Sequence, residues 1–201
     1  MIEEKDYIKT LVIIQGISRK HMPDLPYHNY DHADEVALAS GRMGCYYLLS
    51  GNDALLLGTA SYLHDIIFEV GGKDNEERSA QFAYEHLPSL GYEQMEIEQI
   101  GKLILATKLP TNPESRLEEI ICDADLSNLG TPRFFSCNDA LQRERDVKDR
   151  LIWLEGSYDF LKGHGYYTEA GRNLFGEGIQ RNLSTLKNLI NIEKQKQKMY
   201  D

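Results

Sequence analysis

The chain has 201 residues, of which 41% are hydrophobic and 27% are charged, and its formal net charge is −10. A chain of this length suits one medium domain, which buries roughly 70% of the surface that its unfolded form exposes. Because a nucleic-acid binder usually needs a basic surface, the acidic charge argues against a general reader of the DNA or RNA backbone.

The hydrophobic pattern predicts helices along most of the chain, whereas strand-type alternation is scarce. The first helix is expected over residues 2–18, and the next over 29–49, after a loop that contains two prolines. Asn29 and Asp31 are both suitable N-caps for this second helix. The segment 53–69 is apolar on nearly all faces, which is typical of a helix in the middle of a bundle. Further helices are predicted over residues 75–90, 93–108, 116–128, 132–141, 147–162 and 171–198.

The cysteines and the N-terminus favour a cytoplasmic protein. Cys45, Cys122 and Cys137 are widely spaced and form no Cys-x-x-Cys pair, which argues against a zinc ribbon and a disulfide scaffold, so we expect three reduced, buried thiols. Residues 1–10 are acidic and lack the positive start and apolar run of a secretory signal. The apolar stretches are too short to span a bilayer, so no membrane partner is expected.

Two pairs of polar residues stand inside apolar helical runs. The dipeptide His64-Asp65 follows Leu63, and the second pair is Asp123 and Asp125. A charged aspartate is costly to bury unless it is paired or bound to a metal ion. Neutral imidazoles and ionised carboxylates are ligands of divalent cations such as manganese, iron, cobalt or zinc. Four such ligands from three helices would make a compact site in the core of a bundle.

The order of a histidine, a His-Asp pair and a later aspartate resembles the HD-domain superfamily of metal-dependent phosphohydrolases. The matching segments are Tyr27-His28-Asn29-x-x-His32 with Val36, Leu63-His64-Asp65, and Cys122-Asp123-Ala124-Asp125-Leu126 with Leu129-Gly130. Asn75-Glu76-x-x-Ser79-Ala80 also resembles a segment that follows the His-Asp pair in one predicted subgroup. The resemblance implies an all-α, HD-domain-like helical bundle. It further implies a single domain over residues 1–201, whose C-terminal helices 131–201 pack on a motif-bearing core at about 25–130.

The resemblance also implies a ligand set for one divalent metal ion. The ion would be manganese, iron, cobalt, zinc or magnesium. Members of the superfamily with two metals carry extra histidines between the His-Asp pair and the last aspartate. Here only His86 falls in that interval, in a segment typical of an amphipathic surface helix, so one metal is expected. The implied ligands are His32, His64, Asp65 and Asp125, with Asp123 as the alternative to Asp125.

Further residues near these motifs are candidates for catalysis and substrate binding. His28 precedes His32 by four residues, and it either shares a helical face with His32 or lies in the preceding loop. In the loop it would touch substrate or a residue that supports the metal ligands, or it would simply cap the loop. Asp65, Glu69 or Glu76 would take the proton from the attacking water. The candidates for holding phosphate oxygens are Lys73, Arg78, Lys108 and Arg133.

The predicted activity is metal-dependent hydrolysis of a phosphate ester, by a phosphomonoesterase or a phosphodiesterase. The expected partner is a small phosphorylated substrate, such as a nucleotide. In superfamily members that hydrolyse signalling nucleotides with a 3′-pyrophosphate, an acid tends to stand where this chain has Phe68, which argues against that substrate. The alternative is a non-catalytic HD-like domain that senses a ligand or binds a partner. A metal-dependent oxygenase would generally need two irons and more histidines. The oligomeric state stays open, with a homodimer as one option.

Overall fold

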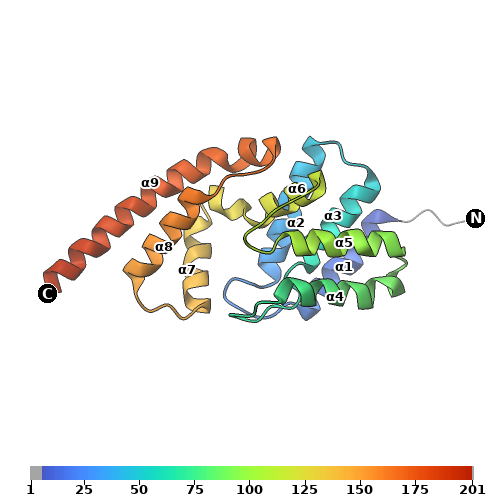
Figure 1. Cartoon of the computed structure of the whole chain (residues 1–201), viewed down its shortest axis with the longest axis horizontal. Coiled ribbons are helices and arrows are strands. Elements are labelled where there is room, and N and C mark those ends of the chain that lie inside the picture. The colour runs from blue at the N-terminus through green and yellow to red at the C-terminus, as the bar shows by residue number, and fades with distance from the viewer. Residues whose placement is uncertain (1–5, 201) are drawn as a thin grey trace, which may run out of the picture. The chain divides into compact units, whose positions relative to one another are not determined.

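The computed structural model describes residues 6–200, and these residues form helices joined by loops, with no strand among them (Figure 1). The chain divides into two compact units, Met1–Asp125 and Leu126–Asp201. Each unit is described by itself below, and a single domain over residues 1–201 stays a prediction. Within residues 6–200, no helix is both long and apolar enough to cross a membrane.

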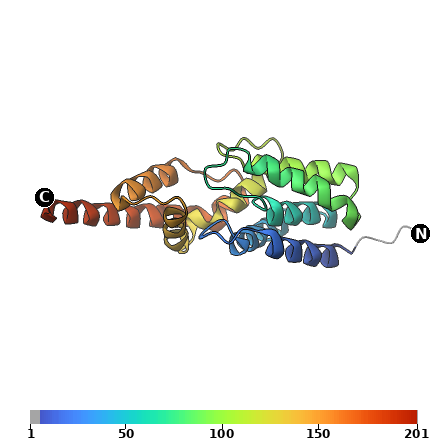
Figure 2. The same ribbon diagram turned by 90° about the horizontal axis from the view of Figure 1, so that it is seen from below.

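The first unit surrounds a central helix, α3. This helix packs against α1, α2, α5 and α6, and Figures 1 and 2 show it among these neighbours. Leu55, Leu56 and Leu57 are all buried, so three successive positions of α3 face protein rather than solvent. Burial of each such side chain contributes about 1.5–3 kcal/mol. The prediction of a central helix is confirmed. The helices of this unit are α1 (Tyr7–His21), α2 (Tyr30–Tyr46), α3 (Gly51–Leu63), α4 (Asn75–His86), η1 (Leu87–Leu90), α5 (Gln94–Ala106) and α6 (Arg116–Asp125).

The end of α3 differs from the prediction. The sequence predicts a helix to residue 69, but α3 ends at Leu63 and His64 is its C-cap. Beyond this point the backbone N–H of Ile66 bonds to the carbonyl of Leu63, a tighter turn than the helical one. The next backbone groups bond to side chains of α4 instead of continuing the helix. The segment after α3 is half-buried, which explains why its residues are apolar although they are not helical.

The start of α2 resolves the two options for its N-cap. Asn29 is the N-cap, and its side-chain oxygen accepts hydrogen bonds from the backbone N–H groups of Asp31 and His32 at 2.9 and 3.2 Å. His28 therefore lies in the loop before α2 and not on the helix. The first helix begins at Tyr7 and extends to His21, beyond the predicted end at residue 18. The part of that prediction over residues 2–5 lies outside the described residues.

The second unit contains a close crossing of two backbone segments. Gly178 of α9 meets Gly130 of η2, and the Asn182 side chain donates hydrogen bonds to the carbonyls of Leu129 and Thr131. A Cβ placed on Gly178 would lie 1.6 Å from the carbonyl oxygen of Gly130. Only glycine fits here. The helices of this unit are η2 (Ser127–Gly130), α7 (Phe134–Glu144), α8 (Arg150–Gly163) and α9 (Glu169–Tyr200).

Gly178→Ala is expected to destabilise the second unit by about 3 kcal/mol or more, because the obstructing atoms are backbone and cannot turn aside. Gly176→Ala is the matched control, since a Cβ there meets nothing within 4 Å and alanine favours the helix by up to about 1 kcal/mol. Urea unfolding followed by the fluorescence of Trp153, which lies in α8 of the same unit, measures both. Equal midpoints for the two variants would contradict the close crossing.

Candidate metal centre

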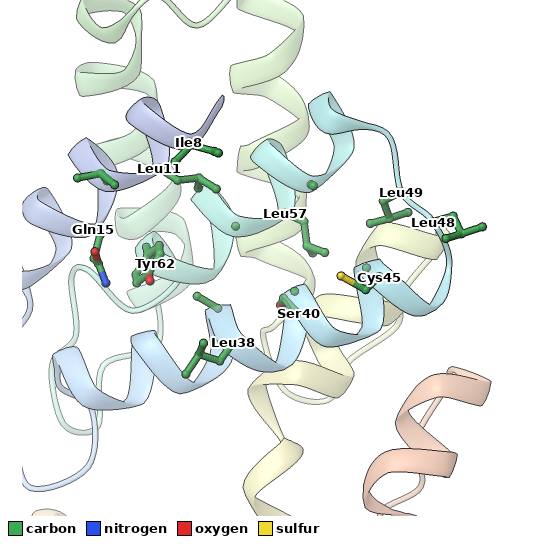
Figure 3. Close-up of a pocket in the computed structure, with 16 residues that line it drawn as sticks. Ile8, Leu11, Gln15, Leu38, Ser40, Cys45, Leu48, Leu49, Leu57 and Tyr62 are labelled. Atoms are coloured by element: carbon green, nitrogen blue, oxygen red, sulfur yellow. The ribbon is translucent and has the colours of Figure 1, made fainter. Parts of the chain in front are cut away.

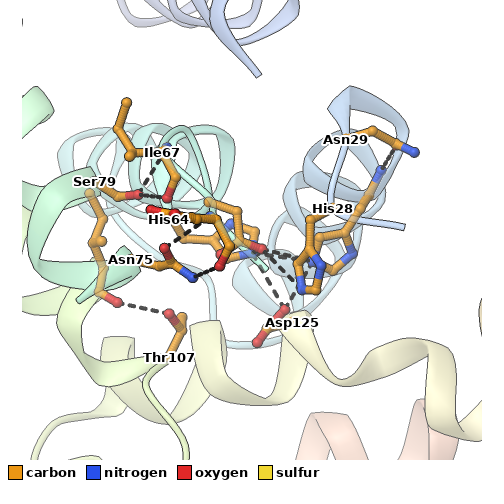
Figure 4. A network of polar contacts seen from close by, with 12 residues as sticks. His28, Asn29, His64, Ile67, Asn75, Ser79, Thr107 and Asp125 are labelled. Atoms are coloured by element: carbon orange, nitrogen blue, oxygen red, sulfur yellow. Dashed lines mark hydrogen bonds and ion pairs between the residues drawn. The ribbon is translucent and has the colours of Figure 1, made fainter. Parts of the chain in front are cut away.

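Three side chains from three helices meet in the first unit. His32 lies in the first turn of α2, His64 caps the C-terminus of α3, and Asp125 is the last residue of α6. Their ligand atoms all lie within 4.8 Å of one another, so this group could hold a metal ion. The two Nε2 atoms are 3.2 Å apart, and Asp125 Oδ1 is 3.1 Å from His32 Nε2 and 3.4 Å from His64 Nε2 (Figure 4).

Asp65, the residue after His64, lies beside this group, which does not itself include it. Its Oδ2 atom is 3.1 Å from His64 Nε2 and 3.6 Å from His32 Nε2. His32, His64 and Asp65 are buried, and Asp125 is half-buried. We call these four residues the His/Asp cluster. Asp123, the alternative to Asp125, is fully buried and does not belong to the group that could hold a metal ion.

The orientation of the His64 ring suits metal binding. Its Nδ1 atom is 2.9 Å from the carbonyl oxygen of Ser61, which can only accept, so Nδ1 carries the hydrogen and donates it. The Nε2 lone pair of the neutral ring then points toward His32 and the two carboxylates. Histidine ligands of metals typically donate their other N–H group in this way, which fixes both tautomer and ring orientation.

The spacing and the chemistry of the cluster fit a divalent cation. Two ligands at about 2.1 Å from one ion, at angles between 90° and 110°, are about 3.0–3.4 Å apart. The separations given above fall in or near this range. Two imidazoles and two carboxylates form a mixed nitrogen and oxygen donor set, which suits manganese, iron, cobalt or zinc. A cation would also offset the negative charge of two carboxylates held in a largely dry site.

The pKa values of the His/Asp cluster are shifted in the protein without a bound cation. Burial by itself would lower the pKa of His64, but the charges of Asp65 and Asp125 outweigh it and raise this pKa well above the ordinary 6.5. Burial would likewise raise the pKa of the two aspartates, but the histidines outweigh it and lower both. These opposite shifts favour a proton on His64 beside ionised carboxylates in the metal-free cluster, and a metal ion would displace that proton.

His28 lies at the edge of the cluster, in the loop before α2. Its Nε2 atom is 4.0 Å from Asp65 Oδ2, and its side chain is only 12% exposed. Its ring stacks on Phe68 with centroids 3.5 Å apart and the planes 13° from parallel. Tyr27 packs edge-on against His28 and tilted against His32. The structure thus brings His28 beside the proposed ligands, together with two aromatic residues to which the sequence assigned no role.

Two of the cations predicted to bind phosphate on the first unit, Arg78 and Lys108, already have acidic partners. Arg78 pairs with Glu69 at 3.1 Å, and both side chains are exposed. The Lys108 ammonium donates to Glu77 and to the backbone carbonyl of Lys73, which brings two of the predicted cations together. Each of these pairs lies near the surface, where ion pairs contribute at most about 1 kcal/mol. A phosphate group would have to compete with a carboxylate for Arg78 or Lys108.

The remaining candidates are spread over both units. Glu76 is half-buried in the first turn of α4, and Lys73 is exposed in the loop before it. His86 is exposed at the end of α4, with Nδ1 2.9 Å from the carbonyl of Phe82, in keeping with the expectation of a surface position. Arg133 belongs to the second unit, where it precedes α7. The catalytic and substrate-binding roles assigned to Glu69, Glu76 and these cations stay predictions.

A hollow lies elsewhere in the first unit, between α1, α2 and α3 (Figure 3). It has a volume of about 620 Å³ and a mostly apolar lining that includes Leu11, Leu38 and Leu57, and it contains no member of the His/Asp cluster. Cys45 lies on its rim and is exposed, so the prediction of three buried thiols is wrong at this position. The other two cysteines are buried, and burial raises the pKa of Cys122 to about 12.

Comparison with known proteins supports the class of fold. No protein-family model matches the chain, and no curated protein matches it either. Among solved structures, the chain is similar to Bacillus subtilis YpgQ, whose crystal structure was determined in complex with ADP. The likeness has a TM-score of 0.65 at 14% identity and covers 92% of this chain and 96% of YpgQ. The prediction of an all-α, HD-domain-like helical fold is confirmed.

Proposed function

We propose that the protein is a metal-dependent phosphohydrolase of the HD-domain superfamily. The observation that carries this proposal is the convergence of His32, His64 and Asp125, whose ligand atoms lie within 4.8 Å of one another. Asp65 serves as the fourth ligand, since its Oδ2 atom faces both histidines. The similar fold of YpgQ, a protein crystallised with ADP, supports a phosphorylated ligand.

The substrate is a small phosphate ester such as a nucleotide, and the cofactor is one divalent ion. When bound, such an ion lowers the pKa of a water ligand and polarises a phosphoryl oxygen. The hydrogen bond from His64 Nδ1 to the Ser61 carbonyl would hold the His64 ring in the orientation of a ligand. His28, beside Asp65, contacts the phosphoryl group as it approaches the cluster. Asp65 would accept the proton of the attacking water through its other carboxylate oxygen, Oδ1, which the metal role of Oδ2 leaves available.

The proposal is tested on protein purified without a chelator. Its metal content is measured first, and the protein is then assayed with p-nitrophenyl phosphate, bis(p-nitrophenyl) phosphate and ADP in the presence of added manganese. We expect about one metal ion per chain and manganese-dependent release of product from at least one substrate. Tight metal binding without turnover of any phosphate ester would favour the non-catalytic HD-like binding domain instead.

A further inference from the structure

Asn75 of α4 holds the backbone of the segment that follows the His64-Asp65 pair. Its side-chain oxygen accepts the N–H of Glu69 at 3.0 Å, and its side-chain nitrogen donates to the carbonyl of the same residue, also at 3.0 Å. Asn75 is only 4% exposed. One amide side chain therefore satisfies both backbone groups of one residue, as a neighbouring β-strand would.

Ser79, one turn further along α4, makes the same kind of contact two residues earlier. Its hydroxyl accepts the N–H of Ile67 and donates to the Ile67 carbonyl, both at 3.2 Å. Ser79 is fully buried. The two side chains thus fix the backbone on either side of Phe68, and Figure 4 shows Asn75 and Ser79 on the side of His64 away from His28. We call this pair of contacts the α4 clamp.

Phe68 connects the α4 clamp to the His/Asp cluster. It is the residue between Ile67 and Glu69, so its backbone is bounded by clamped residues on both sides. Its ring stacks face to face on the His28 imidazole, which comes from a loop and has no helix of its own to orient it. Stacked rings of this kind contribute about 0.5–1.5 kcal/mol beyond their burial, enough to select one ring orientation.

We propose that Asn75 and Ser79 are positioning residues that set the His28 ring at the metal centre by fixing Phe68. The substrate role of His28 in this inference rests on the proposed function. The α4 clamp acts on the segment after His64-Asp65 and on the stacked ring, whereas His32, His64 and Asp125 are held by α2, by the end of α3 and by α6. Loss of the clamp should therefore change substrate turnover but not metal affinity.

The test uses four variants of the full chain and one control variant. Ser79→Ala removes both contacts to Ile67, and Asn75→Asp keeps the acceptor for the Glu69 N–H but removes the donor to its carbonyl. Phe68→Leu removes the aromatic partner and keeps an apolar side chain, and Phe68→Tyr retains the ring. Gln81→Ala is the matched control on α4, because its side chain only pairs with Glu85 on the exposed surface.

The first readout is the NMR spectrum of the histidine ring protons, with the His28 signals assigned by their loss in His28→Gln. Stacking at 3.5 Å places these protons over the Phe68 ring and shifts them upfield. We expect Ser79→Ala, Asn75→Asp and Phe68→Leu to move the signals downfield, while Phe68→Tyr and Gln81→Ala leave them in place. Unchanged His28 signals in Ser79→Ala and Asn75→Asp would overturn the proposal.

The second readout is kcat/KM for the phosphate ester that the wild type turns over, measured beside manganese affinity. Loss of a contact that supports a site residue typically lowers activity 10–100-fold. We therefore expect about a tenfold loss in kcat/KM for Ser79→Ala, Asn75→Asp and Phe68→Leu, and a value near that of the wild type for Phe68→Tyr. Manganese affinity should be unchanged in all of them. An equal loss of manganese affinity would show that the clamp holds the ligands instead. If the signals move as expected but the wild type hydrolyses no ester, the proposed function fails while the positioning role stands.

Discussion

Asp125→Asn is expected to lower the affinity for a divalent cation by more than about 100-fold. Loss of a residue that only supports a ligand costs up to about 100-fold, and Asp125 is proposed as a ligand itself. The change keeps the shape of the side chain but removes a charged ligand whose Oδ1 atom faces both histidines. Phosphate ester turnover should fall by at least the same factor at limiting metal. Titration with manganese, followed by isothermal calorimetry and by activity, measures both effects.

Asp123→Asn is the control for that experiment. Asp123 is two residues away on the same helix and fully buried, but it lies outside the group that could hold the ion. Its replacement is expected to leave the metal stoichiometry at that of the wild type. The reverse result, with metal lost in Asp123→Asn and retained in Asp125→Asn, would assign the carboxylate ligand to Asp123 and refute the cluster.

Metal affinity is expected to fall about tenfold for each pH unit below the pKa of His64 in the folded, metal-free protein. The carboxylates raise this pKa well above the ordinary 6.5, which favours a proton on His64 that would leave when the metal binds. Calorimetry in buffers of different ionisation enthalpy measures the number of protons released. His86→Gln, a change at an exposed histidine, should leave that number unchanged, whereas zero release by the wild type would contradict the protonated cluster.

The same shifts in the pKa values of the cluster determine how the stability of the metal-free protein depends on pH. The raised pKa of His64 contributes stability that is complete below its unfolded value of 6.5 and is lost as pH rises through the folded value. The lowered pKa values of Asp65 and Asp125 contribute stability above their unfolded value of 3.8, which is lost on acidification. The increase in Tm on adding manganese should therefore grow from mildly acidic to alkaline pH. Thermal unfolding with and without manganese tests this.

The helical class and the central helix were predictable because they depend on local hydrophobic periodicity. Three positions of α3 are buried in succession, and the run of apolar letters indicates this directly. The position of Asp125 beside His32 depends instead on how α2 and α6 pack, so Asp123 remained as an alternative. The resemblance to a known family favoured Asp125, which is the aspartate found next to the two histidines.

The α4 clamp shows what the sequence could not reveal. Asn75 and Ser79 are visible as part of a motif, but their targets are backbone groups of Ile67 and Glu69, which leave no trace in the identity of those residues. For the same reason the helix over 53–69 was predicted too long. The apolar letters continue to Ile67, while the hydrogen bonds that would extend the helix are replaced by side chains from another element.

A metal ion at this site would also act as a cross-link. His32 and His64 are 32 residues apart, and Asp125 follows Asp65 by a further 60. One ion would therefore close two long loops of the chain at once. The unfolded chain does not hold these ligands together, so the ion would bind the folded state and its binding free energy would add to the stability of the fold. The cation would then be part of the fold of the first unit as well as of its chemistry.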